Sequence, residues 1–293
     1  MGCFREEWLC RWFQIGVVIV KYVSILLISA GIACLSERPL RADEANVIEF
    51  FKARGDSVAV DDQGHAVRLM ARGTPPLSVQ QLQQIGELTH LTYVGINMSP
   101  ADDSQWGFLA KLPKLKQLKI WHGHHFRSLK AFNGLPVEEL TVGGCMGLHR
   151  LNKSEPDKAQ NVIMTLDKLP NVRKLVLYHS PVAPDDAHLE HLVKSFPGVT
   201  ELRVDFVAPG RGPSRITRKG LRCLSRLRLA HLTIENASTL SGEDLAELAS
   251  IKTLKHLEVF TAKGSKTSEG KYRALLVQFE KLRPEIKVSY VNR

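Results

Sequence analysis

The sequence lacks the short motifs that mark the common enzyme classes. It contains no GxSxG nucleophile turn, no HExxH zinc helix, no P-loop and no dinucleotide-binding fingerprint. Cysteine is also scarce, because only Cys145 and Cys223 lie beyond residue 42, which excludes a disulfide framework, and no Cys/His spacing is typical of zinc. We therefore expect no catalytic residues, no metal and no cofactor. An enzyme whose site residues converge only in space is not excluded.

Positive charge is in excess, because the chain has 40 Lys and Arg residues and 30 Asp and Glu residues. The formal net charge is +10, which favours anionic partners in general and specifies none. The chain shows no recognised nucleic-acid-binding module, so we do not expect a nucleic acid as partner.

A long hydrophobic run is found only at the N-terminus. Val23–Leu35 is uncharged, is preceded by Lys21, and is followed by a polar stretch that ends at Ala42. This order predicts a signal peptide over residues 1–42, cleaved after Ala42. One alternative is a retained anchor over Ile15–Leu35, about 30 Å of helix, which would be the chain's one contact with a membrane. A buried soluble helix is the other. The first two predict an exported protein: periplasmic, on the cell surface or membrane-anchored.

From residue 88 onward one apolar phrase recurs. An apolar residue is followed by two variable positions, another apolar residue, two variable positions, an apolar residue, one variable position and a last apolar residue. Most steps between copies fall near the roughly 20–29 residues of a leucine-rich repeat, with a longer insertion over Asn152–Ile163 that we expect to form a loop on the rim. The third apolar residues of the copies are Val94, Leu118, Leu140, Leu175, Leu202, Leu232 and Leu257.

The end of each phrase alternates apolar and polar residues, which indicates a short half-buried strand. Amphipathic stretches that open on Ser78, Asp185 and Ser241 precede several strands and predict capped helices. A strand–helix unit with one apolar face cannot bury that face alone, so the units must stack. We expect parallel strands in one curved sheet with the helices on its convex side. The chain should end with a helix over Tyr272–Leu282 and an edge strand over Ile286–Tyr290.

Two stretches carry a resemblance to a known family. Ile216–Leu224 (ITRKGLRCL) resembles the helix-opening phrase of bacterial leucine-rich-repeat proteins of the ribonuclease-inhibitor-like or cysteine-containing type, and Leu240–Leu245 is a looser copy. Ser57–Met70, with its DDQG turn, is similar to that family's N-terminal capping hairpin. The whole is similar to exported repeat proteins of planctomycete-like bacteria.

The resemblance covers residues 45–293. It implies an α/β leucine-rich-repeat solenoid, irregular and shallowly curved, with a capping segment over 45–77 and repeats over 78–293. It implies almost nothing about function, because one fold serves many functions.

A candidate ligand site follows from the position just past each strand. Trp121 and Tyr178 occupy this position in different repeats, with Gly143 between them. We expect a shallow aromatic site on the concave face, with an open space over Gly143 between the two rings, because glycine has no side chain to fill it and large aromatics are enriched at binding hot spots. The alternative is that each ring packs on its own neighbours. The basic residues on the same strands are Lys116, Lys119, Arg173 and Lys174.

Three other features have weaker functional interpretations. A basic stretch forms a second candidate surface, although a solvated charged face is the alternative. The histidine-dense stretch of His122, His124 and His125 is interpreted as solvated loop residues rather than a metal site. Cys145 and Cys223 are interpreted as structural thiols, Cys223 being buried on the apolar side of its helix. The basic stretch comprises Arg211, Arg215, Arg218, Lys219, Arg222, Arg226 and Arg228.

Three functional hypotheses remain. The favoured one is an exported, non-catalytic binding module for a protein or an anionic polysaccharide of the cell envelope. The second is a structural envelope component that stacks laterally and has no specific ligand. The third is an enzyme with an unrecognised site. A concave face rich in aromatic or charged groups favours the first hypothesis, and a deep cleft with convergent titratable groups favours the third.

Overall fold

The structure is a computed structural model. It describes residues 44–72, 74–97, 101–123, 128–144, 162–178, 185–205, 216–235, 240–261 and 266–292. Asp43–Arg293 form one compact unit. The predicted signal peptide or anchor, and most of the predicted insertion loop, lie outside the described residues. Within the described ranges, no helix combines the length and the apolar character needed to cross a membrane.

Ten strands form a single sheet in which each strand pairs with the next along the chain. The first pair is antiparallel, and every later pair is parallel. The predictions of parallel strands in one sheet and of an N-terminal hairpin are therefore confirmed. The strands are β1 (Ser57–Val60), β2 (Ala66–Ala71), β3 (Tyr93–Asn97), β4 (Gln117–Trp121), β5 (Glu139–Gly143), β6 (Lys174–Tyr178), β7 (Glu201–Asp205), β8 (His231–Glu235), β9 (His256–Thr261) and β10 (Lys287–Asn292).

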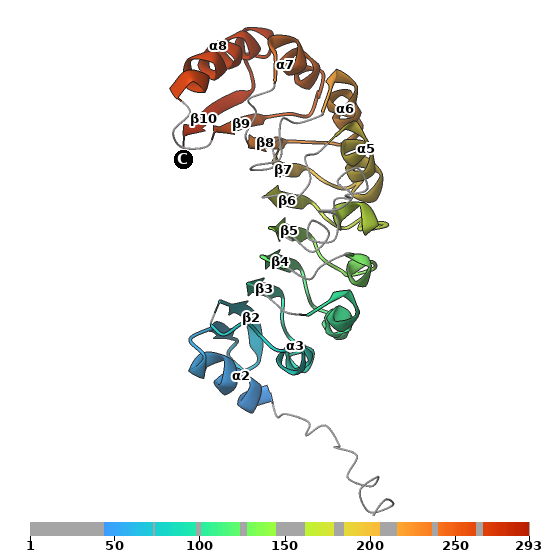
Figure 1. Cartoon of the computed structure of the whole chain (residues 1–293), viewed down its shortest axis with the longest axis vertical. Coiled ribbons are helices and arrows are strands. Elements are labelled where there is room, and N and C mark those ends of the chain that lie inside the picture. The colour runs from blue at the N-terminus through green and yellow to red at the C-terminus, as the bar shows by residue number, and fades with distance from the viewer. Residues whose placement is uncertain are drawn as a thin grey trace, which may run out of the picture. The chain divides into compact units, whose positions relative to one another are not determined.

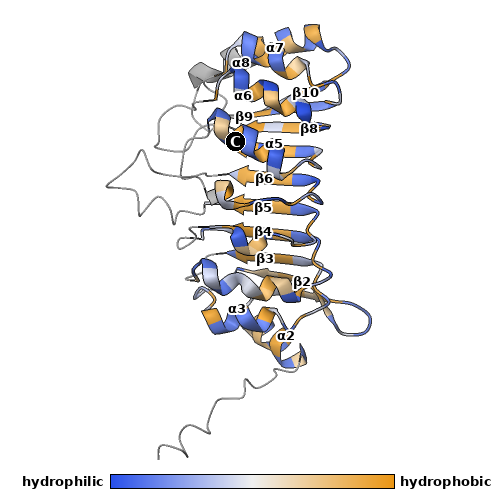
Figure 2. Cartoon of the chain, turned by 90° about the vertical axis from the view of Figure 1, so that its right-hand side faces the viewer, coloured by the Kyte–Doolittle hydropathy of each residue, from blue (hydrophilic) through white to orange (hydrophobic). Residues whose placement is uncertain are grey.

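The helices that connect successive parallel strands lie along the convex side of the curved stack (Figure 1), and most contain both apolar and polar residues (Figure 2). The connections between β3 and β6 contain 3-10 helices, whereas later connections contain α-helices. The stack is therefore irregular, as predicted. The helical segments are α2 (Glu44–Ala53), α3 (Val79–Ile85), η1 (Asp103–Lys111), η2 (Lys130–Phe132), η4 (Val162–Thr165), α5 (Asp186–Ser195), α6 (Arg218–Cys223), η5 (Leu224–Arg226), α7 (Gly242–Ala249) and α8 (Lys266–Leu282).

The predicted helix starts are confirmed by their caps. The side chains of Ser78, Asp185 and Ser241 each accept a hydrogen bond from the backbone N–H three residues later, and each forms a capping box. A cap of this kind satisfies donors that the first turn of a helix leaves unpaired. The last helix, α8, begins at Lys266, six residues before its predicted start at Tyr272.

The core lies between the sheet and the helices. The strands pair in one constant register, so that Leu118, Leu140, Leu175 and Leu202 stand in one row across β4 to β7. The third apolar residue of every predicted copy is buried, which confirms the register assigned from the repeat. Burial of Cys223 in α6 is also confirmed, and this burial raises the pKa of its thiol, as expected of an inert residue.

The N-terminal cap consists of α2 and the β1–β2 hairpin. Helix α2 buries Val47, Ile48 and Phe51. Gly64 closes the hairpin turn with a φ of 87°, a left-handed conformation that glycine adopts without strain. The sequence predicted the hairpin, but it gave no indication of α2.

Candidate functional site

The face of the sheet opposite the helices carries three rows of side chains in register. The first row includes Glu139, Lys174, Glu201, His231 and His256. The second row includes Lys119, Thr141, Val176, Arg203, Thr233 and Glu258. The third row includes Asn97, Trp121, Gly143 and Tyr178. We refer to these three rows as the strand face.

The predicted aromatic pair does occupy one row, with Gly143 between Trp121 and Tyr178. The space between the two positions is nevertheless filled, because a Cβ built on Gly143 would lie 2.1 Å from Cζ of Tyr178. The Tyr178 ring therefore lies over Gly143, and the expectation of an open space between two rings is wrong. The Trp121 ring has Lys119 Nζ 5.2 Å from its centre, within the range of a cation–π contact.

The basic residues around this pair have acidic or carbonyl partners. Lys116 forms an ion pair with Glu138 at 3.4 Å, and Lys174 forms one with Glu201 at 3.4 Å. Arg173 donates a hydrogen bond to the carbonyl of Gly198 at 3.0 Å. The surface predicted to be basic is therefore mixed in charge.

The histidine that follows Trp121 is held by the fold. His122 has a φ of 58°, a left-handed conformation that is uncommon outside glycine. Its N–H donates to the carbonyl of Gly143 at 2.8 Å, and its Nδ1 lies 2.9 Å from Oδ1 of Asn97. His122 is thus a partly exposed loop residue that the fold holds in place, while His124 and His125 lie outside the described residues.

Three basic residues of the second predicted surface, all on α6, are paired with acidic residues. Arg218 pairs with Glu243, Lys219 lies 3.6 Å from Glu190, and Arg222 lies 2.9 Å from Glu247. These contacts join α6 to its neighbours α5 and α7, so the helix presents paired charges rather than a cationic face. Arg211 and Arg215 of this stretch lie outside the described residues.

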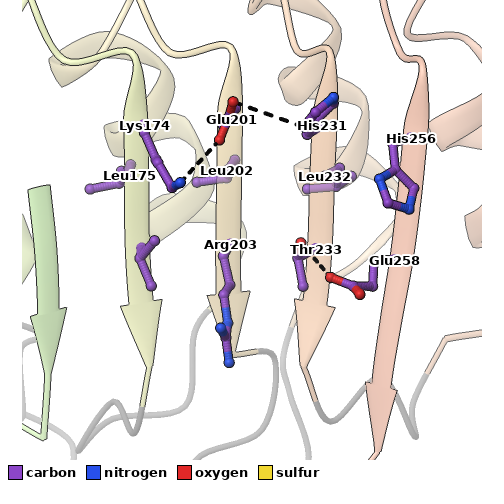
Figure 3. Close-up of a pocket in the computed structure, with 11 residues that line it drawn as sticks. Lys174, Leu175, Glu201, Leu202, Arg203, His231, Leu232, Thr233, His256 and Glu258 are labelled. Atoms are coloured by element: carbon purple, nitrogen blue, oxygen red, sulfur yellow. Dashed lines mark hydrogen bonds and ion pairs between the residues drawn. The ribbon is translucent and has the colours of Figure 1, made fainter. Parts of the chain in front are cut away.

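The strand face contains an open depression that the sequence did not predict (Figure 3). It has a volume of about 230 Å³ and spans β6 to β9. We call it the β6–β9 depression. The sequence did contain one indication of this depression: charged residues occupy the alternate strand positions that face away from the core. Its polar and charged lining residues are Lys174, Glu201, Arg203, His231, Thr233, His256 and Glu258.

The lining groups form a network of both charges. Glu201 contacts Lys174 at 3.4 Å and lies 3.9 Å from Nδ1 of His231. Thr233 donates a hydrogen bond to Glu258 at 3.4 Å. The His231 and His256 rings meet edge to face, with centroids 5.6 Å apart. The depression therefore offers cationic, anionic and aromatic surface within one small area.

His256 is the group in the depression whose protonation the fold opposes. Burial, together with the nearby His231 and Lys287, lowers the pKa of its imidazole, although Glu258 acts in the opposite direction. Its Nε2 also lies 2.9 Å from the Ser289 hydroxyl. The folded state thus favours neutral His256.

This lowered pKa predicts a loss of stability in acid. The unfolded chain binds the proton with a pKa of about 6.5, so the contribution of neutral His256 is fully present above that pH and is lost as the pH falls through the lower folded-state pKa. We expect the pH-dependent fall in the urea midpoint below about pH 6.5 to be smaller in His256→Gln than in the wild type. A folded-state pKa of 6.5 or more for His256, measured by NMR titration, would contradict this prediction.

Comparison with known proteins does not identify a family for this chain. No family model matches the chain, and no curated protein matches it. One solved structure that matches is the leucine-rich-repeat ectodomain of the Arabidopsis receptor kinase HAESA, in complex with an N-terminally extended IDA peptide hormone ligand. The identity is 13%, the TM-score is 0.36, and the match covers 85% of this chain and 41% of the other.

The chain thus spans about two fifths of the length of the HAESA structure it matches. The fold assignment rests on the repeated strand–helix units, the constant register and the single row of buried leucines described above. On these observations, residues 44–292 form an α/β solenoid of the leucine-rich-repeat type.

Proposed function

We propose that this chain is a non-catalytic binding module whose partner is a protein, held on the strand face over β6 to β9. The observation that carries the proposal is the β6–β9 depression, which has both charges in its walls. The strand face of a solenoid is open and extended, and proteins of this architecture use such concave surfaces for binding.

The charges favour a protein over an anionic polysaccharide. Lys174 and Arg203 would attract an anionic chain, but Glu201 and Glu258 line the same depression and would repel it. A protein segment with side chains of both signs meets no such conflict, because its charges can be arranged to complement the walls. Trp121 and Lys119 extend this surface toward β4.

The same surface argues against a structural component without a ligand. A component of this kind is expected to have a strand face with few charged or aromatic groups, and apolar surfaces at the two ends of the solenoid that stack on those of neighbouring molecules. Among the described residues, the large hydrophobic side chains that are exposed are Val60, Val277 and Leu282, which offer little apolar surface for stacking. The strand face, in contrast, is rich in charged and aromatic groups.

We further propose that the protein works outside the cytoplasm and belongs with the exported bacterial repeat proteins that Ile216–Leu224 resembles. The apolar run Val23–Leu35 supports this proposal. A periplasmic reporter fused after residue 45 should be active in a bacterial host. Reporter activity confined to the cytosol would rule out export.

The binding proposal is tested by affinity capture with the full chain from its native source, followed by titration of the retained protein. We expect Arg203→Ala to weaken binding at least about tenfold, or about 1.4 kcal/mol. Arg72→Ala is the matched control, because Arg72 is exposed and lies outside both the depression and the basic stretch. Equal affinity of Arg203→Ala and the wild type, at equal thermal stability, would refute the site. A loss in Trp121→Ala alone would move the site to β4.

A further inference from the structure

A cluster of metal-ligand side chains joins the N-terminal cap to the first repeat, far from the β6–β9 depression in the sequence. Glu44 begins α2, His65 precedes β2, and His90 lies in the turn before β3. Each residue offers one ligand atom, and these atoms lie within 4.8 Å of one another. The fold has thus brought a carboxylate and two imidazoles together from three separate segments.

The contacts within this Glu44–His65–His90 cluster are close. Oε2 of Glu44 lies 2.8 Å from Nδ1 of His65, while Oε1 accepts the N–H of Ala66 at 2.9 Å. The His65 and His90 rings are stacked, with centroids 3.9 Å apart and an interplanar angle of 12°.

One imidazole nitrogen of the cluster lacks a hydrogen-bond partner. Nδ1 of His90 is inaccessible to solvent, and no described residue forms a hydrogen bond with it. Buried polar atoms in folded proteins are nearly always paired, so an unpaired one requires a specific explanation. A bound metal ion would supply the missing partner.

The surroundings of the cluster are acidic. Burial opposes ionisation of Glu44, but hydrogen bonds from His65 and Ala66 hold the pKa of its carboxyl below the usual value. Desolvation likewise opposes ionisation of Asp61, but hydrogen bonds from the N–H groups of His65 and Gln63 together hold the pKa of its carboxyl below the usual value. Both carboxylates are ionised at neutral pH, which favours a cation beside the two imidazoles.

We propose that the Glu44–His65–His90 cluster binds one divalent transition-metal ion, for which Zn²⁺ is the best match. Zinc accepts imidazole nitrogen and carboxylate oxygen as ligands, and three protein ligands with one water complete a tetrahedral site. The side chains of Glu44 and His65 are 23% and 34% exposed, so a hydrated ion can reach them.

Metal binding requires the side chains of the cluster to rearrange. Donor atoms around a tetrahedral zinc ion lie about 3.4 Å apart, because each bond is about 2.1 Å long. The ligand atoms of the cluster already lie within 4.8 Å of one another, and the two stacked rings must rotate so that their lone pairs converge on the ion. The ion takes the place of the hydrogen bond between His65 and Glu44 and joins α2, the hairpin and the first repeat.

The test uses the full chain, stripped of metal with a chelator. Titration calorimetry with Zn²⁺ should show one site per chain, and Co²⁺ should give the visible spectrum of a nitrogen- and oxygen-bound ion. We expect His90→Gln to weaken Zn²⁺ binding at least about tenfold, and Zn²⁺ should raise the Tm of the wild type but not that of the variant. Circular dichroism checks that the variant is folded. If His90→Gln does not fold, His65→Gln takes its place, because the His65 side chain is 34% exposed.

The matched control is the double variant His124→Gln/His125→Gln, because the histidine-dense stretch is the rival metal site. This variant should bind Zn²⁺ as the wild type does. Loss of binding in the control variant, retention of full affinity in His90→Gln and His65→Gln, or failure of the wild type to bind Zn²⁺ or Co²⁺ would each overturn the proposal.

Discussion

Replacing Leu202 with alanine is expected to lower the free energy of unfolding by about 2–5 kcal/mol. Leu202 is 2% exposed and stands between Leu175 and Leu232 in the buried row of the sheet. Truncation removes apolar contacts and leaves a cavity that the fixed register of the neighbouring strands prevents from closing. Because each unit of a solenoid is stabilised by its neighbours, the loss should extend to β6 and β8.

Urea denaturation measures the change in free energy, and hydrogen exchange of the β6 and β8 amides measures its spread. The matched control is Leu282→Ala at the end of α8, where the same side chain is 56% exposed. We expect a much smaller change there. An unfolding free energy for Leu202→Ala equal to that of the wild type would show that the assigned register is wrong.

Phe51→Ala in α2 is expected to lower the free energy of unfolding by about 3–5 kcal/mol, since large buried aromatics give the largest truncation effects. Phe51 is 0% exposed, and it holds α2 against the β1–β2 hairpin together with Val47 and Ile48. Terminal caps shield the first repeat of a solenoid from solvent, so their loss should also reduce solubility.

The adjacent Phe50 provides the control, because its ring is only partly buried although it meets Phe51 edge to face at 5.2 Å. Phe50→Ala should have a clearly smaller effect in the same urea experiment. Should Phe51→Ala increase hydrogen exchange in the cap while the midpoint of global unfolding stays unchanged, the cap would be an independent unit that the repeats do not need.

The sequence predicted the repeats because their signal is redundant. The same apolar phrase returns at Val94, Leu118, Leu140 and later copies, so a single irregular copy does not obscure the strand register. Helix α2 has no such support, since it stands alone before the first copy. Its burial of Phe51 depends on the hairpin that follows.

The candidate site was predicted less well, for a geometric reason. The row that contains Trp121, Gly143 and Tyr178 follows from the repeat, but the direction of the Tyr178 ring does not. The β6–β9 depression combines residues such as Arg203 and Glu258 from separate repeats, and their proximity is visible only once the strands are aligned.

The constant register has a consequence for how such a surface changes over evolution. Each strand from β2 to β9 pairs with the next without an offset, so every repeat adds one residue to each row of the strand face. Duplication or deletion of a whole strand–helix unit therefore lengthens or shortens the strand face by one strand. The rows of buried apolar residues stay continuous in either case. A gene of this kind acquires new recognition surface by recombination between its own repeats, without the need to redesign a core.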